Sequence, residues 1–186
     1  MTVPDSPEEL TGDYDLDPAH TRLGFTARHA MVTKVRGAFT EFEGQLHIEG
    51  GNPAASNGRV TIVANSIDTG VAQRDEHLRS NDFFDMPTYP EIRFESTAIS
   101  PDGDSFTLTG DLTVKDVTKP ITLNVEFTGA AVDPMGNTRI GFEATGSLNR
   151  KDWGITWNAP LEAGGVLVSD KIGLDIDISA IKRKAD

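Results

Sequence analysis

The polar residues best suited to chemistry lie close together in one segment, residues 72–80. Arg74, Asp75, His77 and Arg79 fall within six positions of one another. An arginine presents a fork of N–H donors that suits a phosphate or quinone head group. We therefore predict that Arg74, His77 and Arg79 contact the polar head of a ligand. The alternative interpretation is that the arginines pair with neighbouring carboxylates and only stabilise the local fold.

The histidines and carboxylates show no spacing typical of a catalytic or metal centre. The sequence has no H-x-x-x-H pair, no G-x-S-x-G element, no phosphate-binding or dinucleotide glycine motif, and no cysteine. We therefore predict no catalytic residue, no bound metal and no cofactor, and a protein that is not an enzyme. One alternative stays open: an enzyme acting on a lipid, in which His29 or His77 is the acid–base group.

These side chains depend on the strands around them, which the alternation of apolar residues indicates. In about eight stretches large apolar residues recur at every second position, as at Phe106, Leu108, Leu112 and Val114. This alternation is typical of strands with one face kept from water. A short helix is expected over residues 72–80, where the alternation stops. We expect strands at residues 20–31, 35–48 with a bulge near 40–41, 59–67, 92–100, 105–114, 120–129, 138–150 and 171–181, and a short extended piece at 14–16.

The order of these strands predicts an all-β fold. Most neighbours along the chain are joined by short turns or by the one helix, which favours an antiparallel meander. Closing eight such strands into a barrel leaves no unpaired sheet edge. Residues 13–186 are therefore expected to form a single barrel domain after a flexible arm, residues 1–12.

An eight-stranded barrel is just wide enough either to be filled by side chains or to hold one slim ligand. Small residues at inward positions favour an elongated cavity, and they are Ala27, Ala64, Ala98, Gly110, Ala144 and Gly146. The alternative is that larger neighbours pack into these gaps. An apolar slot could hold a hydrocarbon tightly, since each buried methylene contributes about 0.8 kcal/mol. The residues predicted to line the cavity are Phe25, Ala27, His29, Phe42, Ile62, Phe94, Leu108, Leu112, Leu123, Val125, Phe142 and Trp157.

Three of the larger polar and aromatic residues have two interpretations each. Trp153 and Trp157 lie in the segment 151–169, which is too long for an ordinary hairpin. They either cover the entrance of the cavity or pack this loop against the barrel. His29, at an inward position, either contacts the head group or is a hydrogen-bonded core residue.

Charge and targeting features narrow the range of partners. The chain carries 17 basic and 29 acidic residues, a formal net charge of −12. This charge disfavours nucleic acid, whose phosphates need surplus Lys and Arg, and also an electrostatic hold on anionic membranes. No apolar run approaches the roughly 18 residues of a transmembrane helix, so stable membrane insertion is not expected. The N-terminal sequence lacks the basic and apolar regions of a signal peptide, so we expect a cytoplasmic protein.

Several stretches, in order from about residue 13 to residue 181, carry a family resemblance. They are YDLDPAHTRLGFTARH at 14–29, RDEHLRSNDFF at 74–84, GDLTVKDVTKPITL at 110–123 and NRKDWGITW at 149–157. In these stretches the chain resembles the YceI-like family of polyisoprenoid-binding proteins. The segment 74–84 is the most diagnostic of them.

The resemblance implies an extended, lipocalin-like barrel of eight antiparallel strands with a helix between strands. Its elongated cavity is expected to hold an isoprenoid chain, such as a prenyl diphosphate or the tail of an isoprenoid quinone. Family members commonly form homodimers, and no catalytic residue is established for the family, so none is carried over. Asp116 stands where the family often has Gly. Because Asp tolerates a left-handed turn better than most residues, we expect the hairpin there to form.

The function predicted from these features is the binding, sequestration or transport of an isoprenoid lipid. Two alternatives stay open beside it. One is the enzyme acting on such a lipid, and the other is a ligand-free stress-response interaction module whose barrel is solidly packed.

Overall fold

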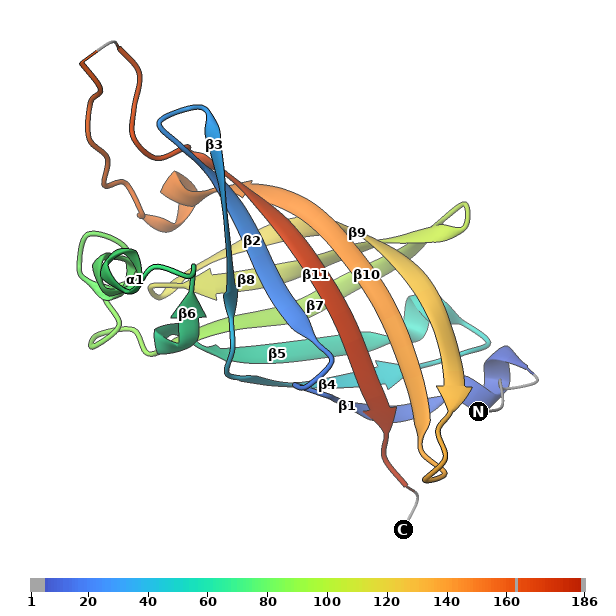
Figure 1. Cartoon of the computed structure of the whole chain (residues 1–186). Helices are drawn as coiled ribbons and strands as arrows, with labels where there is room; N and C mark the ends of the chain where they lie inside the picture. The colour runs from blue at the N-terminus through green and yellow to red at the C-terminus, as the bar shows by residue number, and fades with distance from the viewer. Residues whose placement is uncertain (1–5, 163, 185–186) are drawn as a thin grey trace.

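The computed structural model describes residues 6–162 and 164–184, which form one closed antiparallel β-barrel with a single α-helix (Figure 1). The strands are β1 Gly12–Leu16, β2 Arg22–His29, β3 Thr33–Phe39, β4 Phe42–Ile48, β5 Asn57–Val63, β6 Ile67–Asp68, β7 Glu91–Asp102, β8 Ser105–Val114, β9 Val117–Val132, β10 Thr138–Asn149 and β11 Lys171–Lys182. The helices are α1 Ala72–Arg79 and the short 3-10 helices η1 Pro7–Leu10, η2 Pro53–Ala55, η3 Ala64–Ser66 and η4 Arg150–Trp153. None of the helices in these ranges is long and apolar enough to cross a membrane.

The eight-stranded barrel predicted from the alternation is confirmed, although three of its eight wall positions are each divided between two short strands. The order around the barrel is β1-β4-β5-β7-β8-β9-β10-β11, and β1 closes the ring by pairing with β11. The divided positions are β1 with β2, β3 with β4, and β5 with β6. Both β1 and β2 pair with β11, so together they occupy one position in the wall. Likewise β3 continues the position of β4, and it pairs with β2 on one side and with β6 on the other. Strands that follow one another in the chain are therefore neighbours in the wall, as a meander requires.

The predicted strand 35–48 is interrupted rather than bulged. The Thr40 N–H donates to the Ser66 carbonyl at 3.2 Å, and the Val63 N–H donates to the Glu41 carbonyl at 2.9 Å. The Ser66 hydroxyl also donates to the Val63 carbonyl at 2.7 Å. These bonds satisfy the backbone where regular pairing stops, so β3 ends and β4 begins across this point. The prediction of one continuous strand was wrong for this reason.

The neighbouring strand also ends early and leads into the helix. β5 ends at Val63 instead of the predicted residue 67, and η3 and β6 connect it to α1. The helix predicted over 72–80 is confirmed. Its buried Asp75 accepts hydrogen bonds from the N–H of Thr69 at 2.9 Å and from the hydroxyl of Thr69 at 2.5 Å. This carboxylate ties the helix to the chain that leaves β6.

The hairpin expected at Asp116 is confirmed. Lys115 and Asp116 have φ angles of 52° and 60°, and the flanking Val114 and Val117 are paired across the turn. Two successive residues with positive φ form the tight turn whose twist matches that of the strands. Asp116 adopts this conformation in place of a glycine.

Residues 7–12 belong to the folded domain, although the flexible arm was expected to extend to residue 12. Residues 7–10 form η1, and Gly12 begins β1. A Cβ at Gly50 would lie 1.6 Å from the Pro7 carbonyl oxygen, so only glycine permits this close approach. The Gly50 N–H donates to the Thr11 hydroxyl at 3.0 Å. The rest of the predicted arm, residues 1–5, lies outside the described residues.

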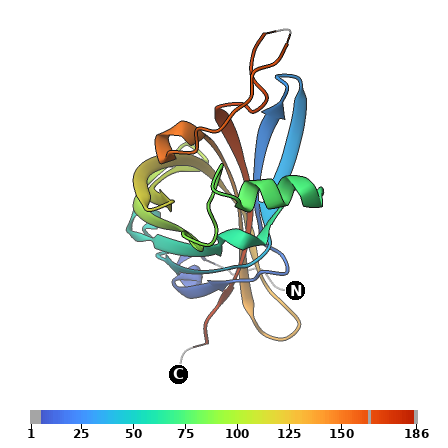
Figure 2. The ribbon, with the colours of Figure 1, turned by 90° about the vertical axis from the view of Figure 1, so that its left-hand side faces the viewer.

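The buried core forms two clusters. One surrounds the chain near α1 and η4 and includes Ile67, Phe83 and Trp153. The other surrounds β1 and includes Tyr14 and Ala180, each 0% exposed. Figure 2 views the barrel from its α1 end, with α1 lying beside the ring of strands. The remaining inward side chains line the interior of the barrel.

Candidate functional site

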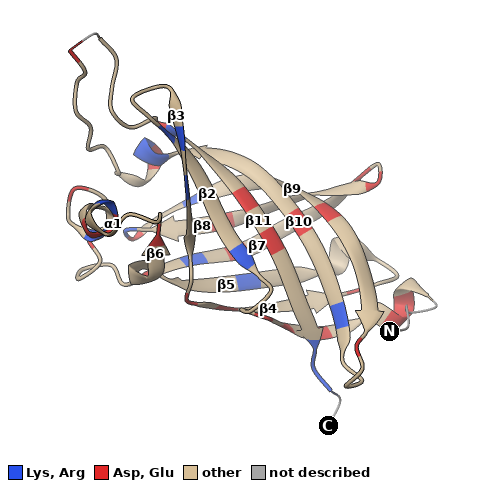
Figure 3. Cartoon of the chain, viewed as in Figure 1, with Lys and Arg blue, Asp and Glu red and all other residues tan. Residues whose placement is uncertain are grey.

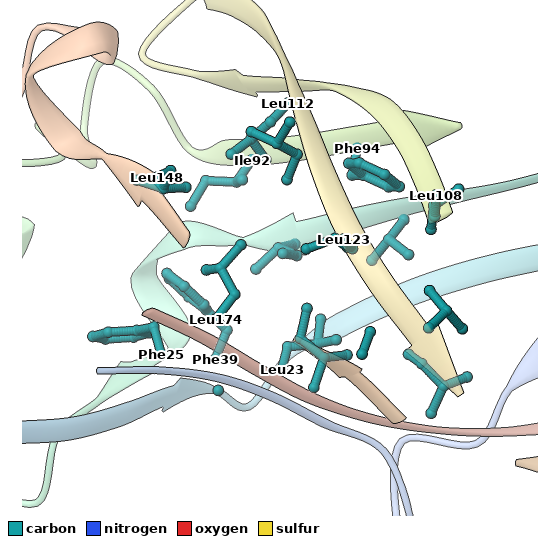
Figure 4. Close-up of a pocket in the computed structure, with 18 of the residues that line it drawn as sticks. Leu23, Phe25, Phe39, Ile92, Phe94, Leu108, Leu112, Leu123, Leu148 and Leu174 are labelled. Carbon is teal, nitrogen blue, oxygen red and sulfur yellow. The ribbon is translucent and has the colours of Figure 1, made fainter. Parts of the chain in front are cut away.

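An elongated cavity of about 1630 Å³ runs through the barrel. At one end, beside η1 and η2, its lining includes Leu10, Ile48 and Pro53, and at the α1 end it includes His77 and Trp157. Pockets for small ligands usually measure roughly 300–1,000 Å³, so this cavity suits a larger molecule. Figure 4 shows leucine, isoleucine and phenylalanine side chains from opposite strands facing one space. The elongated cavity predicted from the sequence is confirmed.

The side chains that face this cavity do not fill it. Phe94, Leu108 and Leu112 point inward (Figure 4), yet each keeps part of its surface accessible. Phe127 lines the cavity and is 42% exposed. A barrel packed with its own side chains would bury such residues as tightly as any protein interior. The accessible apolar surface is therefore the inner surface of an open tunnel.

The small residues predicted to face inward differ in what they contribute. Two of them line the cavity, namely Ala27 and Ala144. At Gly110 the ring of Phe94 takes the space of a side chain, since a Cβ there would lie 2.3 Å from it. The side chain of Leu123 covers Gly146 in the same way, at 2.6 Å. Packing by larger neighbours, the alternative for these positions, thus holds at the two glycines.

Ala98 was wrongly predicted to face inward. The pairing of β7 with β8 shifts between Ser96 and Ala98, which marks a bulge. A bulge reverses the alternation, so Ser96 and Ile99 line the cavity while Ala98 is exposed. Ala64 is buried within the core cluster near α1.

Most residues predicted to line the cavity lie on it. They are Phe25, Ala27, His29, Ile62, Phe94, Leu108, Leu112, Leu123, Val125, Phe142 and Trp157. Phe42 is not part of the lining and packs against the cluster that contains Tyr14 and Leu16. The reason lies in β1: Leu16 covers the inner face of β4, where a Cβ at Gly44 would lie 2.5 Å from it.

The two arginines of α1 are held by backbone carbonyls. Arg74 lines the cavity and donates to the Thr69 carbonyl and hydroxyl, both at 2.7 Å. Those bonds occupy two of the five N–H donors of a guanidinium. Arg79 does not line the cavity and donates to the carbonyls of Asn65 and Ile67, each at 3.1 Å. Arg79 therefore stabilises the local fold, as the alternative interpretation proposed. Its partners are backbone carbonyls and not the carboxylates that were expected.

His77 lies at the α1 end of the cavity within an aromatic cluster. Its ring meets Trp157 edge to face, with ring centroids 4.6 Å apart, and meets Phe83 at 5.0 Å. Its Nε2 is 2.8 Å from the Asp82 carboxylate, which fixes the orientation of the ring. Trp157 is thereby held against α1 and lines the cavity.

Trp153 packs the loop 151–169 against the barrel, which was the second role considered for the two tryptophans. It is 3% exposed, and its indole N–H donates to the Leu112 carbonyl at 2.9 Å. The contact fastens η4 to the end of β8. Trp153 therefore packs the loop against the barrel, whereas Trp157 lines the α1 end of the cavity.

No sequence pattern pointed to Arg150, whose side chain holds the loop after η4. This side chain is 4% exposed and donates to the carbonyls of Ile155 at 2.8 Å, Trp157 at 2.9 Å and Ser169 at 2.9 Å. Burial lowers the pKa of Arg150, and the neighbouring Asp170 carboxylate opposes that shift. An arginine at the end of an alternating strand is ordinarily a surface residue, which is why its role was not predicted.

His29 lies at the rim of the cavity, where the β2–β3 hairpin meets the loop after η4. Its backbone pairs with that of Val168, and the Ala30 N–H donates to the Leu167 carbonyl at 2.8 Å. The side chain lines the cavity and is exposed. The interpretation of His29 as a hydrogen-bonded core residue is therefore wrong.

This arrangement joins an apolar tunnel to a few polar groups near its ends, which is typical of sites for small amphiphilic ligands. Among residues 6–162 and 164–184, no group of three or more His, Asp or Glu side chains could hold a metal ion. The chemistry on offer is burial of a chain along the tunnel and hydrogen bonding at its α1 end.

Known proteins share this sequence pattern over most of its length. The family model of the YceI-like domain matches residues 14–180. The UPF0312 protein plu2095 of Photorhabdus laumondii is 42% identical over 146 residues, which cover 77% of this chain and 76% of that protein. Protein YceI of Escherichia coli O157:H7 is 37% identical over 177 residues, which cover 94% and 90%.

Solved structures share the fold. The YCEI protein of Campylobacter jejuni has 30% identity and a TM-score of 0.73, with 91% of this chain and 97% of that chain covered. BcnA of Burkholderia cenocepacia has 22% identity and a TM-score of 0.77, with 88% and 98% covered. A polyisoprenoid binding domain from Saccharophagus degradans has 16% identity and a TM-score of 0.65, with 93% and 99% covered. On the family match and the identities, this chain belongs to the YceI-like family.

Proposed function

We propose that this protein binds an isoprenoid lipid, a prenyl diphosphate or an isoprenoid quinone, in the barrel cavity and sequesters or transports it. The observation that carries the proposal is the elongated apolar tunnel, whose inward side chains keep accessible surface. A methyl-branched chain would gain about 0.8 kcal/mol for each methylene that it buries there. The solved domain from Saccharophagus degradans, which has the same fold, is named a polyisoprenoid binding domain, and this supports the choice of ligand.

The charges of the lining orient the ligand with its head group at the α1 end. Arg28, Arg74 and His77 line the cavity there, whereas two acidic residues, Glu49 and Asp104, and one arginine, Arg59, line it at the opposite end. An anionic diphosphate is attracted by the first set and repelled by the second. The apolar chain then runs along the tunnel toward η1.

Native mass spectrometry of the purified protein tests this function. We expect a co-purifying lipid, and binding of added geranylgeranyl diphosphate or an isoprenoid quinone. Ala27→Trp places a large side chain in the cavity and should weaken binding by at least about tenfold, since it removes several buried methylenes. Ala98→Trp is the matched control, because Ala98 is an alanine exposed on the outside of the barrel. A protein that carries no lipid and binds neither probe would overturn the proposal.

The position of His77 allows a test of the alternative function, an enzyme that acts on a lipid with His77 as its acid–base group. His77 lines the cavity and is hydrogen bonded to Asp82, as a general base would be. If the protein only binds its ligand, lipid recovered after long incubation is chemically unchanged. A product that disappears in His77→Gln would favour the enzyme instead.

A homodimer, implied by the family resemblance, and a cytoplasmic location, expected from the N-terminal sequence, are retained as part of the proposal. Sedimentation of the purified protein measures its oligomeric state, and fractionation of cells measures its location.

Transfer of a labelled isoprenoid between two vesicle populations separates transport from sequestration, because a sequestering protein retains the lipid.

A further inference from the structure

The β2–β3 hairpin is basic on an acidic molecule. Residues 26–37 contain Arg28, Lys34 and Arg36 and no acidic residue, whereas the whole chain has a net charge of −12. All three side chains are exposed, and within the described ranges none forms an ion pair. Figure 3 shows Lys and Arg on β3, and acidic residues along β10 and β11.

The three cations lie side by side. Arg28 is paired directly with Lys34 across the hairpin, and Arg36 is paired with Thr26, two positions further along the same face. Like charges placed directly opposite destabilise a β-sheet. An anionic partner would remove this repulsion, so the cluster is suited to a negatively charged surface.

Beyond the cations the hairpin ends in an apolar tip. Met31 is 63% exposed, Val32 is 74% exposed, and Val166 in the adjoining loop is 41% exposed. Met31 lies against Gly165, where a Cβ would come within 2.1 Å of its sulfur. Ala30 and Met31 have positive φ angles of 50° and 67°, which turn the chain sharply. Met31, Val32 and Val166 form the apolar tip. The β2–β3 turn, which contains Met31 and Val32, projects from the barrel beside the loop after η4 (Figure 1), and the cations lie on the two strands behind it.

This tip borders the mouth of the cavity. Arg28 and His29, from the hairpin, and Leu167 and Val168, from the adjoining loop, all line the cavity. Backbone pairing between His29 and Val168 holds the two segments together. A partner surface that contacts the tip would therefore also lie against the mouth of the cavity.

We propose that the apolar tip and the cations Arg28 and Lys34, with Arg36, dock on an anionic phospholipid bilayer. Exposed apolar residues enter the boundary between head groups and acyl chains, while nearby Lys and Arg contact the lipid phosphates. Charges are screened over about 8–10 Å, so the local cluster decides the contact more than the total charge does. Figure 3 shows acidic residues along β10 and β11, and these favour an approach by the tip; the loop beside the tip carries one exposed acidic residue, Glu162.

This surface deepens the proposed function, because an isoprenoid lipid dissolved in a bilayer would meet the cavity mouth directly. The net charge of −12 led us to expect no electrostatic hold on anionic membranes. That expectation treated the charge as evenly spread. The structure gathers cations where the rim of the cavity lies beside the exposed apolar side chains of the tip.

Co-sedimentation of the full chain with vesicles tests the docking surface. We expect binding to vesicles of phosphatidylcholine mixed with phosphatidylglycerol, weaker binding to phosphatidylcholine alone, and loss of binding at high salt. Removing the three cations together (Arg28→Gln, Lys34→Gln, Arg36→Gln) should cost about fivefold each, on the order of 100-fold in all. Arg93→Gln with Lys184→Gln is the control, since both residues are exposed outside this cluster and neither lines the cavity.

The apolar tip has its own pair of variants. Met31→Ser with Val32→Ser should abolish most of the binding, whereas Met135→Ser, which is 81% exposed at the β9–β10 turn, should leave it unchanged. Val32→Trp should be quenched by brominated phospholipids, and Met135→Trp should not. Equal loss in tip and control variants, binding to acidic peptides instead of vesicles, or no vesicle binding at all would overturn the proposal. The vesicles need no isoprenoid, so this result is independent of whether the cavity binds one.

Discussion

At the scale of single residues, Arg150 shows how a buried charge can build a loop. The segment between η4 and β11 has few regular strand partners for its carbonyl groups, and the guanidinium supplies donors to four of them. Asp170, whose carboxylate is 3.7 Å from the Arg150 Nη2, balances part of the charge. Because one of the four carbonyls belongs to Trp157, Arg150 also positions a residue that lines the α1 end of the cavity.

Replacing Arg150 tests this role. In Arg150→Met four carbonyls lose a donor. Since an unsatisfied buried group costs about 1–3 kcal/mol, the free energy of unfolding should fall by about 3 kcal/mol or more. Urea denaturation followed by tryptophan emission measures the loss. Lys151→Met, the neighbouring and half-exposed residue, should change it by less than about 0.5 kcal/mol. Arg150→Lys keeps the charge without the planar fork and should fall between them. Equal stability of Arg150→Met and the parent protein would contradict this account.

At the scale of elements, the β9–β10 turn is held by one carboxylate. Asp133 accepts the N–H groups of Met135 at 2.9 Å and Asn137 at 3.0 Å, and the Arg139 guanidinium at 2.9 Å. These bonds, with the Asn137 N–H first and Arg139 next, lower the pKa of Asp133 to about 2. Arg139 also donates to Asp17 at 2.8 Å, so the turn is fastened to the chain that follows β1.

This turn should become less stable in acid. The pKa of Asp133 in the unfolded chain is about 3.9 and in the folded protein about 2. The carboxylate therefore stabilises the fold fully above about pH 4, and this contribution is lost as the pH falls toward 2. In urea titrations at several pH values, the difference in unfolding free energy between the parent protein and Asp133→Asn should be constant near neutrality and shrink between pH 4 and 2. If this difference in unfolding free energy did not change with pH, the charge of Asp133 would not contribute to the stability of the fold.

Alternation alone was enough to predict the long strands and much of the cavity lining. β8 has the predicted bounds, 105–114, because its inward residues alternate without a break. The break between β3 and β4 could not be predicted, because it depends on hydrogen bonds between Thr40 and Ser66, which are 26 residues apart in the sequence. Ala98 and Phe42 were misplaced because the bulge in β7 and the position of Leu16 over β4 depend on tertiary structure. The rim at His29 was predicted only as an inward position, because pairing with Val168 is not visible in sequence.

At the scale of the whole molecule, the barrel is a shell around an interior that its own side chains leave open. Phe94 and Leu108 face a tunnel instead of a packed core. A ligand that fills the tunnel would bury this surface, and binding to the folded state alone raises the stability of that state. Occupancy of the cavity and stability of the protein are therefore linked.

Thermal unfolding should report that link. At an isoprenoid concentration about 100 times its Kd, the folded state gains about 2.7 kcal/mol, which corresponds to a rise in Tm of roughly 5–10 °C for a chain of this size. Ala27→Trp should show a much smaller rise at the same concentration, while Ala98→Trp should match the parent protein. If neither probe shifts the Tm of the parent protein, the tunnel does not bind it.

The closure of the barrel has a further consequence, for the order of events in synthesis. The ring is sealed by pairing of β1 with β11, in which Tyr14 is opposite Lys182 and Leu16 is opposite Ala180. One of the first strands to leave the ribosome therefore waits for the last, and contacts between residues so distant in sequence form slowly. Until β11 has been made, there is no closed tunnel, so a nascent chain cannot retain a lipid along its full length. Loading of the cavity must follow completion of the chain.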